Sequence, residues 1–160
     1  MMRDYGDAVL TAQPLRLKKN GAADSINGSI ASVPRALKEL VLVIDDSAAM
    51  IDVLTDILDY LGCDVASASN GQDGLTAYEQ QHDKVSLVIL DMNMPTMNGE
   101  ETLKGLRAIN PDVKVIISSG ISEAEARQRC VEQDQELPYF LPKPYDLATA
   151  RTLIRATLHA

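Results

Sequence analysis

The sequence predicts an α/β fold, namely a doubly wound, five-stranded parallel sheet with the strand order 2-1-3-4-5. The first observation behind this prediction is that short apolar runs alternate regularly with segments of helical period along residues 39–160. The second is that three of these runs are continuously apolar, as strands buried on both faces require, whereas two are short or alternating. The two weaker runs are therefore expected at the edges of the sheet.

The first half of this region predicts two strand and helix pairs. Residues 41–44 (VLVI) form the first strand, and Ser47 is expected to cap a helix that ends at Gly62. The expected inward face of that helix consists of Met50, Val53, Leu54, Ile57, Leu58 and Leu61. Residues 64–68 alternate as a half-buried strand does, and a second helix runs from about Gln72 to Gln81.

The second half predicts three further strands and three helices. The third strand ends at Asp91, the fourth covers residues 115–118, and the fifth covers residues 139–141. The third helix carries Leu103, Leu106 and Ile109, and the last helix, capped by Asp146, is expected to face inward with Leu147, Ala150, Leu153, Ile154 and Leu158. The fourth helix opens with a capping box, Ser122-x-x-Glu125, but has only Ala124, Ala126, Cys130 and Val131 as apolar residues. It is therefore expected to be the least firmly anchored helix.

Composition narrows the class of protein. The chain has 160 residues, 46% of them apolar, which suits one soluble domain, residues 39–160, preceded by a flexible tail or linker, residues 1–38. No run is long enough to span a membrane and no signal peptide is visible, so a cytoplasmic protein is expected. The net charge of −8 argues against binding of nucleic acid. Cys63 and Cys130 lack the spacing of a zinc site or redox pair.

Polar residues follow four of the predicted strands at the edge where ligands collect in parallel α/β sheets. The first strand is followed by Asp45 and Asp46, the third ends at Asp91, the fourth is followed by Ser119, and the fifth is followed by Lys143 beyond Pro142. Three carboxylates at one edge repel one another unless a cation lies among them, and hard oxygen ligands suit Mg²⁺. The sequence therefore predicts a Mg²⁺ site at this edge.

Taken together, these motifs resemble the response-regulator receiver domain, the phosphoacceptor module of two-component signalling. The resemblance covers roughly residues 39–158 and rests on the acidic pair, on Asp91-x-x-Met94-Pro95-x-x-x-Gly99, on Ser119-Gly120 and on Lys143-Pro144, in the family's order after the expected strands. It implies the flavodoxin-like receiver fold.

The resemblance also implies a role for each site residue. Asp91 is expected to accept the phosphoryl group. The metal is expected to be bound directly by Asp46, Asp91 and the backbone carbonyl of Asn93, whereas Asp45 is expected to act largely through water. Lys143 and the hydroxyl of Ser119 are expected to contact phosphoryl oxygens, with the Lys143-Pro144 peptide bond cis and Gly120 leaving access to the acyl phosphate. Phe140 matches the switch aromatic residue; taken alone, it would be an ordinary residue of an edge strand.

The implied function is phosphorelay signal transduction, in which a histidine kinase or a histidine phosphotransfer protein supplies the phosphoryl group. Such a domain is not an enzyme with an external substrate, because it catalyses only its own phosphorylation and dephosphorylation. Its output is a changed surface, expected on the fourth helix, fifth strand and fifth helix, which also offers a route to a homodimer.

Two other classes of protein share part of this residue pattern. A haloacid-dehalogenase-like phosphatase also uses Asp, Mg²⁺, Ser or Thr and Lys, but it requires a second Asp where this chain has Asn93. A degenerate interaction module is disfavoured because all the expected site positions hold competent residues. The sequence does not distinguish a free-standing regulator from a part of a hybrid kinase. It also does not identify the partner kinase, the signal, the downstream target or the phosphoryl lifetime.

Overall fold

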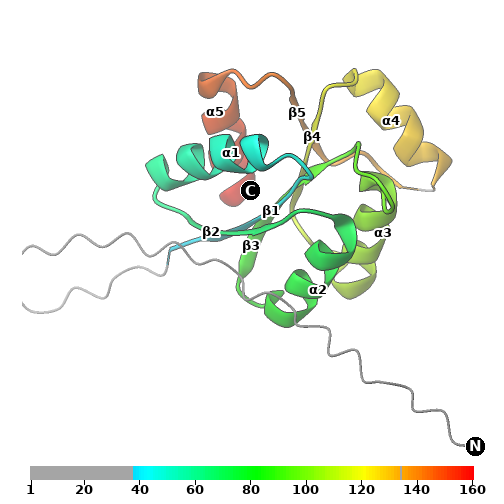
Figure 1. Cartoon of the computed structure of the whole chain (residues 1–160), viewed down its shortest axis with the longest axis horizontal. Coiled ribbons are helices and arrows are strands. Elements are labelled where there is room, and N and C mark those ends of the chain that lie inside the picture. The colour runs from blue at the N-terminus through cyan, green and yellow to red at the C-terminus, as the bar shows by residue number, and fades with distance from the viewer. Residues whose placement is uncertain (1–37, 134) are drawn as a thin grey trace, which may run out of the picture.

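The computed structural model of the chain describes residues 38–133 and 135–160, which form five strands and five helices in strict alternation (Figure 1). The strands are β1 (Leu40–Ile44), β2 (Asp64–Ala68), β3 (Val85–Asp91), β4 (Val115–Ser119) and β5 (Tyr139–Pro142). The helices are α1 (Ala48–Tyr60), α2 (Gly71–Gln81), α3 (Gly99–Ile109), α4 (Glu123–Glu132) and α5 (Leu147–Leu158). Apart from Lys38, the expected tail of residues 1–38 lies outside the described residues.

The strands form a single sheet in the order β2-β1-β3-β4-β5, and all four pairings are parallel. This confirms the predicted fold class and strand order. Every residue of β4 is buried, as are the last four residues of β1 and the last five of β3, whereas β2 and β5 alternate or are partly exposed. The continuously apolar strands lie at the centre because only there are both faces of a strand covered.

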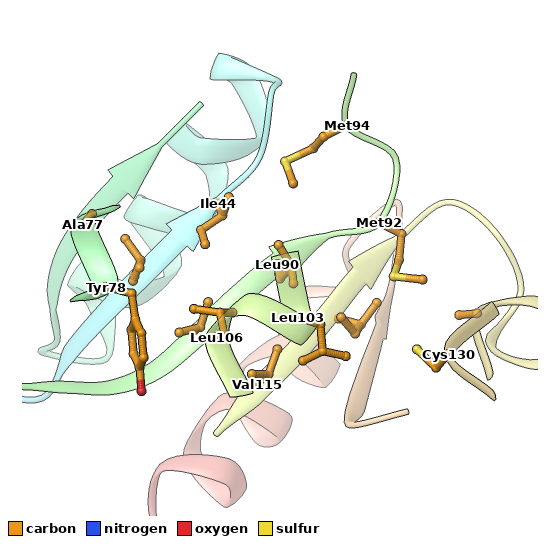
Figure 2. Packing of buried hydrophobic residues seen from close by; sticks show 14 of the residues in the cluster. Ile44, Ala77, Tyr78, Leu90, Met92, Met94, Leu103, Leu106, Val115 and Cys130 are labelled. Carbon is orange, nitrogen blue, oxygen red and sulfur yellow. The ribbon is translucent and has the colours of Figure 1, made fainter. Parts of the chain in front are cut away.

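Helices cover both faces of the sheet, and each face has its own hydrophobic core. Alternate residues of β1 show the division: Leu42 and Ile44 pack on the face covered by α2, α3 and α4, while Val41 and Val43 pack on the face covered by α1 and α5. Figure 2 shows the first of these cores, where the ring of Tyr78 and the side chains of α3 lie against the sheet. Because alternate residues pack into the two cores, the face of the sheet toward which each side chain at a strand end points is fixed.

Side chains cap the helices at their predicted starts. Ser47 accepts a hydrogen bond from the backbone N–H of Met50, and Asp146 accepts one from the backbone N–H of Thr149. Ser122 likewise accepts from Glu125, although the Glu125 carboxylate pairs with Arg129 instead of completing the expected box. A full capping box is present at α3, between Asn98 and Glu101, where the sequence analysis did not identify one.

Two residues expected to face inward are exposed instead. Val53 lies at the border of the buried stripe of α1 and is 40% exposed, and Leu147 is the first residue of α5 and is 55% exposed. Val131 is 62% exposed at the end of α4, so that helix is held in the core by Ala126 and Cys130. The expectation that α4 carries little apolar anchorage is therefore confirmed, and the anchorage is smaller than predicted.

The two ends of the described domain lie at the amino edge of the sheet, where the parallel strands begin. Lys38, just before β1, forms an ion pair of 3.7 Å with Asp64, the first residue of β2. Lys114, just before β4, donates hydrogen bonds of 3.0 and 2.9 Å to the carbonyl oxygens of Leu158 and Ala160. These contacts place both ends beside the starts of strands.

Among the described residues, no helix is long and apolar enough to cross a membrane. Cys63 and Cys130 are buried free thiols.

Candidate functional site

The strand register brings the predicted site residues to one edge of the sheet. Asp45 continues β1, since its backbone N–H donates to the carbonyl oxygen of Ala68 at 3.1 Å. Asp91 is the last residue of β3, and Ser119 is the last of β4. Lys143 directly follows β5, and its backbone N–H donates to the carbonyl oxygen of Ser119 at 2.8 Å. All of these residues therefore lie at the carboxyl edge, as predicted.

Three carboxylates form the acidic centre of this edge. One oxygen atom from each of Asp45, Asp46 and Asp91 lies within 4.8 Å of the others. Asp45 and Asp91 are 1% and 4% exposed, whereas Asp46 is open to solvent. The backbone N–H of Ser47 donates to Asp45 at 2.8 Å and so fixes that carboxylate at the start of α1.

Lys143 joins two of the three carboxylates. Its Nζ lies 2.7 Å from Oδ2 of Asp45 and 3.2 Å from Oδ1 of Asp91, and its side chain is only 18% exposed. The peptide bond between Lys143 and Pro144 is cis, as the resemblance to receiver domains implied. One ammonium group thus faces a cluster of three carboxylates and leaves the cluster with an excess of negative charge.

The protonation behaviour of this pair follows from its burial. Burial raises the pKa of the Asp91 carboxyl; the Lys143 ammonium lowers it and the Asp45 charge raises it, and the net pKa is above the usual value. For Lys143, burial opposes the charged form, but the hydrogen bond to Asp45 and the charges of Asp91 and Asp45 outweigh it, so the pKa of Lys143 is also raised. Lys143 therefore stays charged, and an additional cation would favour ionised Asp91.

The donor set fits a hard divalent cation. The three carboxylates offer oxygen ligands, two of them are held rigidly by buried contacts, and the exposed Asp46 leaves an approach from solvent. Mg²⁺ prefers a few carboxylate ligands together with water and phosphate oxygens. Among the described residues this is the group of acidic side chains with the geometry to hold a metal ion.

The loop after β3 brings α3 against the peptide that carries Asp91. Thr96 adopts the left-handed conformation with φ of 71°, and the backbone N–H of Gly99 donates to the carbonyl oxygen of Met92 at 3.0 Å. A Cβ atom at Gly99 would come within 2.6 Å of the carbonyl oxygen of Asp91 and of Cα of Met92. Only glycine allows the start of α3 to approach the backbone of Asp91 and Met92 this closely, and this contact fixes the position of the loop between β3 and α3.

Ser119 and Phe140 form no hydrogen bond or ion pair with the carboxylates of the acidic centre. The hydroxyl of Ser119 is fully buried and accepts a hydrogen bond of 3.3 Å from the backbone N–H of Ile121. A Cβ atom at Gly120 would meet no atom within 4 Å, so the space beside Ser119 is open. Phe140 is half-buried and packs against the core under α2, α3 and α4 rather than at the acidic centre.

Two contacts at this edge were not predicted. Arg129 of α4 donates to the side-chain oxygen of Asn93 at 3.1 Å, although in the sequence Arg129 looks like half of an exposed helical pair with Glu125. The hydroxyl groups of Ser118 and Tyr145 lie 2.6 Å apart behind Lys143, and either can be the donor. Both contacts join residues far apart in the chain, and no local pattern marks them.

The fold and this acidic edge define a class of protein: a doubly wound α/β domain that carries a carboxylate flanked by other carboxylates and a lysine at the carboxyl edge of its sheet. The family model described as "Response regulator receiver domain" matches residues 41–155. The chain therefore belongs to the response regulator receiver domain family of two-component systems.

Two curated relatives and one solved structure illustrate this membership. The chain is 31% identical over 121 residues to the probable transcriptional regulator ycf27 of Porphyridium aerugineum, covering 76% of this chain and 48% of the relative. It is 30% identical over 152 residues to the sensor kinase CckA of Brucella abortus, covering 95% of this chain and 15% of the relative. The crystal structure of a response regulator receiver domain protein from Clostridium thermocellum superposes with a TM-score of 0.68 at 25% identity and covers 76% of this chain and 94% of that one.

The chain thus spans about half the length of one relative and a small part of the other. The relatives share the receiver domain with this chain, while their full-length activities differ by name. Family membership therefore applies to the domain described here. It does not assign to this chain the activity of any full-length relative.

Proposed function

We propose that the chain acts in phosphorelay signal transduction by accepting a phosphoryl group on Asp91 in a Mg²⁺-dependent reaction. The observation that carries this proposal is the position of Lys143, which bridges Asp91 and Asp45 beside the exposed carboxylate of Asp46. This arrangement places one nucleophilic carboxylate beside a lysine ammonium and beside oxygen ligands for a cation, and phosphoryl transfer requires such cationic neutralisation from a protein. The donor is a phosphohistidine of a histidine kinase or of a histidine phosphotransfer protein.

In the transfer, the bond between phosphorus and the imidazole nitrogen of the donor breaks, and a bond forms between phosphorus and a carboxylate oxygen of Asp91. The imidazole leaves as a neutral group after taking up a proton. Lys143 then turns from the Asp91 carboxylate to a phosphoryl oxygen, and the hydroxyl of Ser119 donates to another. Mg²⁺, when bound, neutralises charge on the phosphoryl oxygens. Later attack of water on phosphorus restores the carboxylate and releases inorganic phosphate.

The direct test is phosphorylation by a small phosphodonor such as acetyl phosphate, followed by intact-mass measurement. One added phosphate is expected with Mg²⁺, and none when the metal is removed by a chelator. Labelling that is unchanged by the chelator, or the absence of labelling with every small donor and with a phosphorylated histidine phosphotransfer domain, would contradict the proposed function.

We expect the affinity for Mg²⁺ to depend on Asp46 more than on Asp45. Asp46 is exposed and ready to bind, as is the carbonyl of Asn93, whereas Asp45 already accepts bonds from Lys143 and from the backbone of Ser47. Calorimetric titration of Mg²⁺ should therefore show a larger loss of affinity in Asp46→Ala than in Asp45→Ala. Thermal melting of both metal-free variants controls for a fold defect, and equal affinities would count against the assignment.

We further propose that the surface of α4, β5 and α5 changes on phosphorylation. Drawing Ser119 toward the phosphoryl group opens space behind it, Phe140 is only half-buried, and α4 is anchored by Ala126 and Cys130. The same face exposes apolar surface for a partner or a second copy. Hydrogen exchange with and without a beryllofluoride phosphoryl mimic should change between residues 119 and 145, and changes confined to α1 and α2 would refute this switch.

A further inference from the structure

Asn93 joins the phosphoacceptor to a neighbouring helix through groups on the same residue. Asn93 lies two residues after Asp91, and its backbone carbonyl is the proposed metal ligand. Its side-chain oxygen accepts a hydrogen bond of 3.1 Å from Nη1 of Arg129. Arg129 therefore contacts the residue whose conformation sets the position of the proposed metal-binding carbonyl.

Arg129 is itself held by two carboxylates, one on each side. Nη2 lies 2.9 Å from Oε1 of Glu125, one turn earlier on α4, and Nη1 lies 3.8 Å from Oε1 of Glu100 on α3. The Glu100 side chain is only 8% exposed, and its Oε2 is buried without a hydrogen-bond partner. Two charged contacts thus fix the planar guanidinium group, which limits the entropy lost when it donates to Asn93.

The comparison with Arg127 shows that this arrangement is specific. Arg127 lies on the same helix and also pairs with a glutamate one turn earlier, Glu123, at 3.0 Å. Its side chain is 58% exposed, and that pair is the ionic contact it makes among the described residues. Arg127 therefore shows what a solvated helical ion pair looks like on α4, and Arg129 adds a contact across to the loop after β3.

We propose that Arg129 is a positioning residue that holds Asn93 in the conformation competent for binding the metal. The proposal rests on the proposed function, because it concerns the affinity of that site for Mg²⁺. It also makes α4 a part of the site: displacement of this weakly anchored helix withdraws the donor from Asn93. By reciprocity, occupancy of the site favours the position of α4 in which Arg129 reaches Asn93.

The test compares Mg²⁺ affinity, measured by calorimetry, in four variants of the full chain: Arg129→Ala, Arg127→Ala, Asn93→Ala and the double variant of Arg129 and Asn93. Loss of one hydrogen bond predicts about 2–10-fold weaker binding in Arg129→Ala than in Arg127→Ala. Removal of the positive charge of Arg129 by itself favours Mg²⁺ binding and therefore opposes the expected weakening. The decisive quantity is the coupling between the substitutions at Arg129 and Asn93. In the Asn93→Ala background, which keeps the backbone carbonyl, the weakening caused by Arg129→Ala should disappear.

Two further measurements separate positioning from stability and charge. In the metal-free proteins, hydrogen exchange of residues 92–99 should be faster in Arg129→Ala than in Arg127→Ala, with similar melting temperatures. Arg129→Lys keeps the charge but lacks the planar fork, and it should recover only part of the affinity. Equal Mg²⁺ affinity in Arg129→Ala and Arg127→Ala, or an effect of equal size with and without the Asn93 side chain, would overturn the proposal. Failure of the proposed function itself would appear differently, as no Mg²⁺ binding by the unmodified chain.

Discussion

Replacing Asp91 by asparagine is expected to abolish phosphorylation of the chain while preserving or raising its thermal stability. An amide has no nucleophilic carboxylate oxygen, so acetyl phosphate and Mg²⁺ should add no phosphate to Asp91→Asn. The effect on stability follows from the raised pKa of Asp91, which shows that the folded protein disfavours the ionised carboxyl relative to the unfolded chain. At neutral pH, removal of that charge takes away a destabilising contribution, and Lys143 retains its partner Asp45.

Intact-mass measurement and a melting curve on the same sample check both parts of this prediction. Asp112→Asn is a suitable control, because Asp112 is an exposed carboxylate in the loop before β4, at the opposite edge of the sheet. It should be labelled like the unmodified chain. Unchanged labelling of Asp91→Asn would show that another residue accepts the phosphoryl group.

The second large effect is expected at Gly99, where a methyl group should destabilise the fold. The added Cβ would meet backbone atoms of Asp91 and Met92 at 2.6 Å, and backbone cannot rotate away as a flexible side chain can. Inserting one carbon into such a contact costs about 1–3 kcal/mol of unfolding free energy. Urea denaturation of Gly99→Ala should therefore show a clearly lower midpoint.

Gly120→Ala provides the matched comparison in this experiment. A Cβ at Gly120 meets no atom within 4 Å, so the same chemical change should leave the midpoint nearly unchanged, or raise the free energy of unfolding by at most about 1 kcal/mol through the unfolded state. If both variants unfold at the same urea concentration, close approach of α3 to the Asp91 peptide does not limit stability.

The sequence was sufficient to predict the features of the fold that depend on local composition. Continuous apolar runs marked β1, β3 and β4 as central strands, and Asp45, Asp91 and Lys143 could be placed at one edge because parallel strands all point the same way. These inferences need only the hydrophobic pattern and the position of polar residues at strand ends. The motif Lys143-Pro144 identified the lysine at this edge, and the structure pairs its ammonium group with both aspartates.

The parts that could not be predicted depend on contacts between distant segments. Arg129 and Asn93 are 36 residues apart, and no periodic pattern connects an arginine on a polar helix with a loop asparagine. Val53 and Leu147 were misplaced for a related reason: helical period identifies a stripe, but its width depends on how closely the helix lies against the sheet. Val53 lies at the border of its stripe and Leu147 at the start of its helix, so the burial of each side chain depends strongly on that distance.

The positions of the two ends of the described domain determine from which side a further segment joins it. The contact of Lys38 with the start of β2, and of Lys114 with the carbonyl groups of Leu158 and Ala160, places both ends at the edge of the sheet away from Asp91. Each point of attachment therefore lies on the side of the domain remote from Asp91. Under the proposed function, a donor histidine therefore approaches Asp91 at the edge of the sheet opposite to both attachment points.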